Sequence, residues 1–245
     1  MLELKNICYT ADNDGATKEI LKNINLKIGD GFTAITGPNG GGKSTLAKII
    51  SGIITPSSGE IFLDGENITG LNITERANKG ISFAFQQPVK FKGITVQDLI
   101  RLASNKKISI SDACDYLSQV GLCARDYIDR EVNASLSGGE LKRIEIATVL
   151  ARSTKISLFD EPEAGIDLWS FSNLIKVFEK LHDSSGGSII IISHQERILN
   201  IADNVIVISA GEVKAQGKKD DILPELLGTT NTACSVLTEN LKGAL

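Results

Sequence analysis

The chain contains a glycine-rich run, GPNGGGKST at positions 37–45, with the spacing of a loop that binds phosphate groups. The run fits the pattern G-x-x-x-x-G-K-[ST], follows a short β-rich stretch and precedes an apolar periodic segment. Glycines let successive backbone N–H groups point at phosphate oxygens, and the N-terminus of the next helix adds partial positive charge. A simple glycine-rich turn is the alternative, but such turns seldom need Lys and Ser directly after the last glycine.

Three side chains of this loop have predicted roles. We expect Lys43 to reach the β- and γ-phosphates of a nucleotide, Ser44 to ligate Mg²⁺ and Thr45 to lie close to the phosphates. The predicted nucleotide-binding residues of the loop are Gly37, Pro38, Asn39, Gly40, Gly41, Gly42, Lys43, Ser44 and Thr45.

Two adjacent carboxylates follow a predicted buried strand in the run KISLFDEPE, positions 155–163. Ligands of open parallel sheets lie at the carboxyl ends of the strands. We therefore expect Asp160 to belong to the Mg²⁺ shell and Glu161 to polarise the attacking water, because phosphoryl transfer needs a positioned water. Without the phosphate loop, two acids in a strand-to-loop turn would be an equally good interpretation.

Three further segments could touch a nucleotide. The run LSGGE (136–140) opens a helix, and Ser137 with Glu140 fits a capping box, although a glycine-rich helix N-terminus is also a phosphate-binding surface. A single histidine is more often structural, but His194 follows the apolar strand SIIIIS, and this position favours an additional contact with the γ-phosphate. Gln86 begins a loop where its amide could reach both the metal and the attacking water.

The elements that must position these residues follow from hydrophobic periodicity. Alternating apolar residues predict strands over 2–8 and 20–28, and apolar runs predict strands at 155–160 and 188–193. Helical spacing begins at residue 95, where Thr95 with Asp98 favours a helix start, and recurs around Leu117 before Gly121. The pattern predicts an α/β nucleotide core, interrupted by a mainly helical lobe at about 95–152.

Composition excludes several classes of function. The net charge of −4 argues against a protein that mainly binds nucleic acid. No apolar run approaches the length of a membrane span and the first ten residues do not resemble a secretory signal, so we expect a cytoplasmic protein without direct membrane insertion. Cys8, Cys114, Cys123 and Cys234 are scattered, which predicts free thiols in a reducing compartment.

The order of the motifs resembles that of the ATP-binding cassette (ABC) ATPases, over residues 2 to 217. The resemblance implies a RecA-like P-loop NTPase core with an N-terminal antiparallel β subdomain and an inserted helical subdomain. It implies ATP and Mg²⁺ as ligands, Gln86, Glu161 and His194 as catalytic residues, and Ser44, Gln86 and Asp160 as metal ligands. The implied domains are an ATPase domain over 1–222 (core 1–90 and 153–222, helical subdomain about 91–152) and a helical tail over 223–245.

The same resemblance implies that two copies bind ATP head to tail. The P-loop of one copy would then face Ser137, Gly138, Gly139 and Glu140 of the other. Asp167 would lie at the seam of this ATP-dependent homodimer.

Within the family, several positions resemble the SufC group, the ATPases of the SUF iron–sulfur cluster assembly system. The run SGGELKRIEI (137–146) resembles that group, whereas transporter ATPases more often carry Gln at 140 and a small apolar residue at 145. Glu163 also differs from the usual transporter Thr, whereas Pro162 is the transporter-like choice. This branch implies SufB-like and SufD-like scaffold proteins as partners.

Two alternatives remain beside the SUF hypothesis. The chain could be the ATPase subunit of a membrane transporter, and the surface around 84–105 would then contact a membrane partner. It could also be a module that binds ATP without hydrolysing it, although the presence of Glu161 and His194 argues against this.

Overall fold

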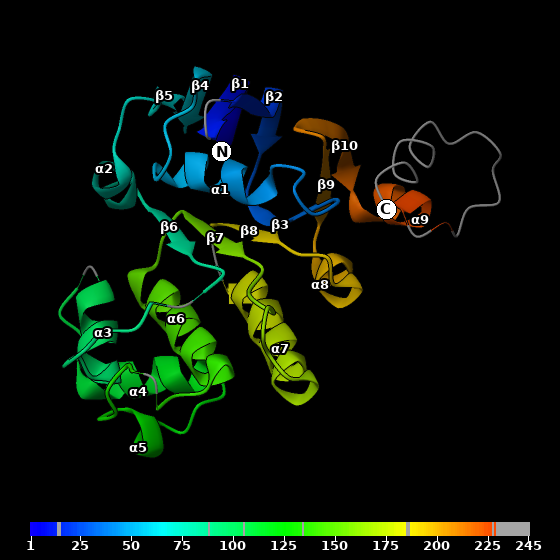
Figure 1. Cartoon of the computed structure of the whole chain (residues 1–245). Coiled ribbons are helices and arrows are strands. Elements are labelled where there is room, and N and C mark those ends of the chain that lie inside the picture. The colour runs from blue at the N-terminus through cyan, green and yellow to red at the C-terminus, as the bar shows by residue number, and fades with distance from the viewer. Residues whose placement is uncertain are drawn as a thin grey trace. The chain divides into compact units, whose positions relative to one another are not determined.

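The computed structural model describes residues 1–13, 16–87, 89–104, 106–133, 135–184, 187–226 and 228 (Figure 1). The chain forms two compact units, one made of Met1–Lys79 with Ser188–Leu245 and the other of Gly80–Gly187. None of the helices in the described ranges has the length and apolar character that a bilayer crossing requires.

The first unit contains an antiparallel sheet with the strand order β2-β1-β4-β5. Its strands are β1 (Leu2–Asn13), β2 (Ala16–Ile28), β4 (Ser58–Leu63) and β5 (Glu66–Asn67). The alternation seen in the sequence is the pleat of β1 and β2, because Leu2, Leu4 and Ile28 are buried on the same face. Both strands extend further than predicted, β1 as far as Asn13 and β2 from Ala16 onward, whereas residues 14 and 15 lie outside the described residues.

The same unit contains a group of strands in the order β10-β9-β3-β8. They are β3 (Gly31–Thr36), β8 (Ser188–Ile192), β9 (Asn204–Ser209) and β10 (Glu212–Lys218). Strand β3 is parallel to both neighbours, and β10 is antiparallel to β9. The helices of this unit are α1 (Lys43–Ser51), α2 (Ile73–Asn78), α8 (Glu196–Ile201) and α9 (Lys219–Leu226).

The second unit combines a parallel strand pair with five helices among its described residues. The strands are β6 (Ile81–Ala84) and β7 (Ile156–Asp160), and the helices are α3 (Val96–Ala103), α4 (Ile110–Gln119), α5 (Ala124–Tyr127), α6 (Gly138–Arg152) and α7 (Leu168–Ser184). Helix α6 packs against α3, α4, α7 and β6 (Figure 1). It therefore connects the helical part of the unit to its strands.

Helix α6 is more deeply buried than its sequence predicts. The predicted face includes Leu141 and Ile144, which are buried, but Lys142 and Ile146 on other faces are buried too. The reason is that α6 contacts several elements at once, so that a single apolar stripe does not describe its surroundings.

The predicted helix starts are confirmed. Thr95 accepts a hydrogen bond from the backbone of Asp98 and forms a capping box at α3, and Ser137 with Glu140 does the same at α6. A third capping box, formed by Ser109 and Asp112, starts α4.

The domain boundaries remain predictions. The compact unit Gly80–Gly187 includes the predicted helical subdomain 91–152, and it also includes β6, β7 and α7, which fall in the predicted core 1–90 and 153–222. Helix α9 covers only the first residues of the predicted tail 223–245. Residues 227 and 229–245, among them Cys234, lie outside the described residues.

Candidate functional site

The predicted phosphate loop lies between β3 and α1, and two of its glycines, Gly37 and Gly42, cannot be replaced without a clash. Gly37 has a φ of 132°, and a Cβ there would lie 1.9 Å from the carbonyl oxygen of Ile208 on β9. Gly42 has a φ of 102°, and its Cβ would lie 2.6 Å from Cδ2 of Leu21. Both positions combine a left-handed backbone with a close neighbour, which leaves glycine as the residue that fits.

The loop presents the groups that an anionic phosphate needs. Lys43 is only 5% exposed, and its Nζ donates to the carbonyl oxygens of Gly37 (2.7 Å) and Pro38 (2.9 Å), so that the ammonium lies across the loop. Helix α1 begins directly after Gly42, a residue with no side chain to cap the first N–H groups. These donors and the ammonium fit the phosphates of a nucleotide.

His194 lies at the same edge of the strands as the phosphate loop. It follows β8, which pairs in parallel with β3, and the backbone of Ser193 donates to Ile35 at 3.1 Å. Since the loop leaves the carboxyl end of β3, the two predicted segments leave neighbouring strands in the same direction. The His194 side chain is exposed.

The second unit brings together Gln86 and Glu161. Strands β6 and β7 are parallel neighbours, Gln86 follows the first and Glu161 follows the second. The amide nitrogen Nε2 of Gln86 donates to Oε2 of Glu161 at 2.6 Å. Asp160, the last residue of β7, is only 3% exposed. The arrangement places an amide directly beside the carboxylate that we expect to orient water.

The N-terminus of α6 lies against the segment that carries Asp167. A Cβ on Gly138 would lie 3.6 Å from the carbonyl oxygen of Gly165, and one on Gly139 would lie 3.5 Å from Oγ of Ser170. Oδ1 of Asp167 accepts a hydrogen bond from the backbone of Ser170 at 3.0 Å. The two segments predicted to meet a second copy are therefore neighbours within one unit.

Glu140 has a local structural role that the sequence only partly predicted. Its Oε2 accepts from the backbone of Ser137 at 2.6 Å, as a capping box requires, and its Oε1 accepts from the hydroxyl of Tyr127. Burial alone would raise the pKa of Glu140, but the hydrogen bonds from Tyr127 and Ser137 hold this pKa below its usual value. Its assignment as a nucleotide-contacting residue remains a prediction.

Sequence reasoning missed two charged residues of α6 that contact the start of the Gln86 loop. Nζ of Lys142 donates to the carbonyl oxygen of Phe85 at 2.6 Å, and Oε1 of Glu145 accepts from the backbone N–H of Phe85 at 2.9 Å. The available signal was the presence of charges at positions 142 and 145, next to the apolar positions 141 and 144.

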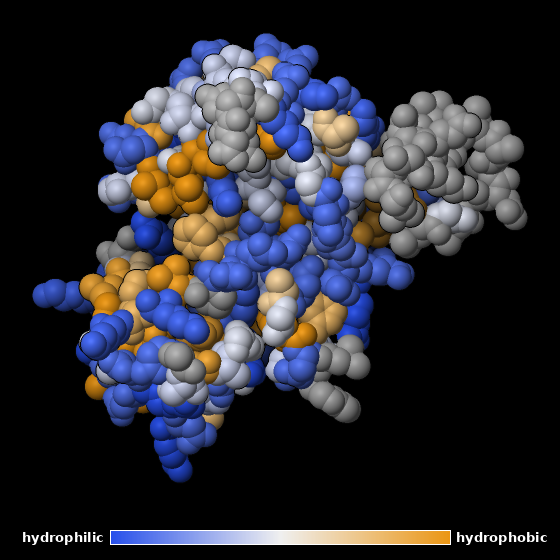
Figure 2. All heavy atoms as spheres, in the orientation of Figure 1, coloured by the Kyte–Doolittle hydropathy of each residue, from blue (hydrophilic) through white to orange (hydrophobic). Residues whose placement is uncertain are grey.

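An apolar groove lies beside this loop in the same unit. Phe83 and Phe85 meet edge to face with ring centroids 4.8 Å apart, and Phe85 and Val89 are 37% and 48% exposed. Figure 2 shows apolar side chains gathered in the region of α3. The groove encloses about 170 Å³, and its walls include Phe83, Phe85, Val89, Phe91, Leu99 and Ile144.

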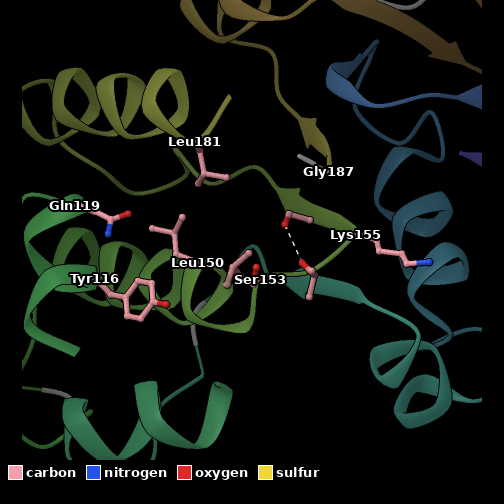
Figure 3. A pocket seen from close by; sticks show the side chains of 10 residues that line it. Tyr116, Gln119, Leu150, Ser153, Lys155, Leu181 and Gly187 are labelled. Atoms are coloured by element: carbon pink, nitrogen blue, oxygen red, sulfur yellow. Dashed lines mark hydrogen bonds between the residues drawn. The ribbon is translucent and has the colours of Figure 1, made fainter. Parts of the chain in front are cut away.

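A second cavity, of about 400 Å³, lies at the N-terminal end of β7, opposite to the end that leads to Glu161 (Figure 3). Tyr116 and Gln119 of α4 and Ser153, just after α6, line it together with Ser157. Ser157 also forms a hydrogen bond with Thr154 at 3.0 Å. The cavity borders the start of β7, whereas Glu161 follows the end of this strand, so the cavity contains none of the predicted site residues.

Comparison with known proteins assigns the family. A family model described as ABC transporter matches residues 21–164, a stretch that includes the phosphate loop, Gln86, the Ser137 helix start and the Asp160–Glu161 pair. The chain belongs to the ABC transporter family. Proteins of this family bind and hydrolyse ATP, so the chain is an ABC ATPase.

Curated relatives of similar length carry transporter names. An uncharacterized ABC transporter ATP-binding protein of Methanocaldococcus jannaschii is 41% identical, over 84% of this chain and 85% of that protein. The probable ATP-dependent transporter ycf16 of Pyropia yezoensis is 36% identical, over 89% of this chain and 91% of that protein. An energy-coupling factor transporter ATP-binding protein of Mesomycoplasma hyopneumoniae is 35% identical, over 91% and 83%.

Solved structures confirm the ABC ATPase fold. An ATP-binding cassette, determined as a dimer in a post-hydrolysis state with ADP and Pi, matches with a TM-score of 0.80 and 27% identity, over 89% of this chain and 99% of that chain. CbiO1 of Clostridium perfringens, part of the ABC transporter complex cbiONQ, matches with a TM-score of 0.75 and 31% identity, over 92% and 91%. The prediction of an α/β cassette with an added β sheet and helical part is therefore correct.

Proposed function

We propose that this ABC ATPase is the nucleotide-binding subunit of a membrane transporter. The observation that carries the hydrolytic role is the hydrogen bond between Gln86 and Glu161 at the ends of β6 and β7. It places a carboxylate that can orient water next to an amide that can hold the same water. The transporter names of the relatives support a membrane-spanning transporter subunit as the partner of this chain.

The residues fall into two groups in this proposal. Lys43 and the backbone N–H groups of the phosphate loop bind the β- and γ-phosphates, and His194 contacts the γ-phosphate. Ser44, Gln86 and Asp160 would hold Mg²⁺, since their hydroxyl, amide and carboxylate oxygens are ligands that suit this hard cation. Bound Mg²⁺ would neutralise charge on the phosphate oxygens.

The second part of the proposal concerns the dimer. ABC cassettes dimerise, and a solved relative was captured as a dimer with ADP and Pi. We propose that Ser137, Gly138 and Gly139 of one copy contact the nucleotide held by the P-loop of the other. This proposed contact is supported by the exposure of Ser137 and Gly138 at the start of α6, where a second copy could reach them. Asp167, also exposed, would lie at the seam between the copies.

The partner contact is proposed at the apolar groove beside the Gln86 loop. Phe85 and Val89 expose apolar surface there, and Phe85 directly precedes Gln86. A partner bound at this groove would therefore act next to the catalytic carboxylate.

A SUF-type ATPase remains the second candidate, because of one observation. Glu145, at a position where transporter ATPases more often carry a small apolar residue, accepts the backbone N–H of Phe85. This glutamate shapes the loop that a scaffold of the SufB or SufD kind would contact. The relatives' names favour the transporter over this candidate.

The test is affinity capture from both membranes and cytosol. The parent chain is compared with a Val89→Asp variant, which alters the apolar groove. The transporter proposal predicts recovery of a multi-spanning membrane protein by the parent chain and its loss with the variant, because the new carboxylate would disrupt an apolar contact. Recovery of soluble SufB-like proteins instead would replace the transporter by the SUF candidate.

Hydrolysis is tested separately on the purified chain and on the captured complex. We expect Mg²⁺-dependent release of phosphate from ATP, and its loss in Lys43→Ala. Phosphate release at the same rate in the parent and in Lys43→Ala would contradict the assignment of the site.

A further inference from the structure

The backbone of Phe85 is held at two points by one helix. Its N–H donates to Oε1 of Glu145 at 2.9 Å, and its carbonyl oxygen accepts from Nζ of Lys142 at 2.6 Å. Lys142 and Glu145 lie three positions apart on α6 and thus on one face of the helix. Both polar groups of a single peptide segment are therefore bound by side chains that are 57 and 60 residues away in sequence.

The two ionisable side chains are buried, which disfavours their charged forms. The Lys142 and Glu145 side chains are only 3% and 16% exposed, and Nζ lies 4.0 Å from the second carboxylate oxygen. Burial lowers the pKa of Lys142 and raises the pKa of Glu145 to about 7. Buried ion pairs often contribute little to stability compared with apolar residues of similar size, so stability alone does not account for this pair, whereas its two hydrogen bonds fix the position of the Phe85 backbone.

The next residue along the chain is Gln86, whose side chain donates to Glu161. We infer that Lys142 and Glu145 are positioning residues for Gln86, because they fix the peptide from which its side chain extends. Neither residue is assigned a contact with the nucleotide, and the inference rests on the proposed role of Gln86 in hydrolysis. We call the two residues and the Phe85 backbone the Phe85 clamp.

The first experiment measures the clamp itself in the full chain, without nucleotide. Amide hydrogen exchange of Phe85, followed by NMR on protein labelled with ¹⁵N-phenylalanine, should be slow in the parent and faster by about tenfold or more in Glu145→Ala. Glu145→Gln should keep slow exchange, because its amide oxygen can still accept the hydrogen bond. Leu150→Met, a change at another half-buried position of α6 that lines the second cavity, is the matched control and should leave Phe85 exchange unchanged.

The second experiment separates positioning from binding. In Glu145→Ala we expect kcat to fall by about tenfold or more, because a small displacement of a catalytic group is costly, with the Kd for ATP within about twofold of the parent. Glu145→Gln should restore most of kcat. A fall in both kcat and ATP affinity that Glu145→Gln fails to restore would indicate general damage and would overturn the inference.

A double-mutant cycle shows whether the effect passes through Gln86. The kcat of Gln86→Ala should be insensitive to a second Glu145→Ala change, because the side chain that the clamp positions is already absent. If Glu145→Ala lowers kcat by the same factor with and without Gln86→Ala, the inference is wrong. Fast amide exchange of Phe85 in the parent would also contradict it. If the chain and its complex do not hydrolyse ATP, the proposed function fails, while the exchange experiment still decides whether the clamp exists. If Glu145→Ala does not fold, Lys142→Met in the same exchange experiment takes its place and must also accelerate Phe85 exchange.

Discussion

Glu161 adopts a left-handed backbone conformation, with a φ of 45°, although it is not a glycine. Such conformations cost about 1 to 3 kcal/mol and persist where the surrounding structure imposes them. Here the carboxylate meets Gln86, so the strained residue is the one that we expect to orient the attacking water.

The first prediction at this scale concerns that carboxylate. Glu161→Gln should bind ATP with the affinity of the parent but release phosphate at least about 100-fold more slowly, because the amide cannot accept a proton from water. Nucleotide affinity and single-turnover phosphate release measure the two effects. Turnover at the parental rate would show that another residue activates the water.

The second prediction concerns pH and stability. The pKa of Glu145 is about 7 in the folded chain, against an ordinary value of 4.5, so the folded state keeps its proton where the unfolded state loses it. The contribution of this group to stability is thus largest below about pH 4.5 and is lost as the pH rises towards 7, by about 3 kcal/mol in total.

The Glu145→Gln variant isolates this effect because glutamine does not titrate. Urea unfolding between pH 5 and 8 should show that the stability of the variant relative to the parent increases with pH. A difference that stays constant over this range would mean that the buried carboxylate titrates near its ordinary pKa.

The sequence predicted which residues form the candidate site better than it predicted the contacts between them. Gln86 and Glu161 were expected to share a water, and the structure brings them into direct contact. The clamp on Phe85 was not predicted, because Lys142 and Glu145 find their partner only when β6 and α6 pack together. Local patterns carry no information about such a pairing.

At the scale of elements, Arg76 connects the end of the P-loop helix to the following segment. It is 1% exposed and donates from Nη1 to Ile49 (2.6 Å) and Ile50 (3.0 Å), and from Nη2 to Thr69 (2.9 Å). Its Nε donates to Leu71 at 3.0 Å. The guanidinium thus satisfies main-chain carbonyls near the C-terminus of α1, and burial lowers its pKa.

We therefore expect Arg76→Met to destabilise the chain by about 3 kcal/mol or more, because it leaves several buried carbonyls without donors. Thermal and urea unfolding would measure this loss. Lys79→Met, which removes an exposed ion pair with Glu66 in the same unit, is the control and should cost less than about 1 kcal/mol. Equal effects of the two changes would refute the role assigned to Arg76.

Short-range signals explain which elements were predictable. Thr95 with Asp98 and Ser137 with Glu140 form their capping boxes within four residues, so the helix starts could be read directly from the sequence. Helix α2 was missed because it has only six residues and its buried member is an arginine, which periodicity counts as polar.

At the scale of the whole molecule, the proposal predicts an assembly that depends on nucleotide. Glu161→Gln with ATP should elute at twice the mass of one chain, because ATP stays bound between two copies, and should return to one chain with ADP. Size-exclusion chromatography with light scattering measures both states. Adding Ser137→Arg should prevent the dimer, since a bulky charged side chain would occupy the start of α6, and a dimer that survives this change would contradict the head-to-tail arrangement.

The burial of Lys142 makes one amine of this chain a natural reporter. Acylating reagents modify neutral, accessible lysines. Lys142 is only 3% exposed and its Nζ is hydrogen-bonded to the carbonyl oxygen of Phe85, so it should react far more slowly than the exposed lysines. Its labelling would increase only when the loop before Gln86 leaves α6. Mass spectrometry of acylated peptides, with and without ATP or a partner, would then record how often that loop opens.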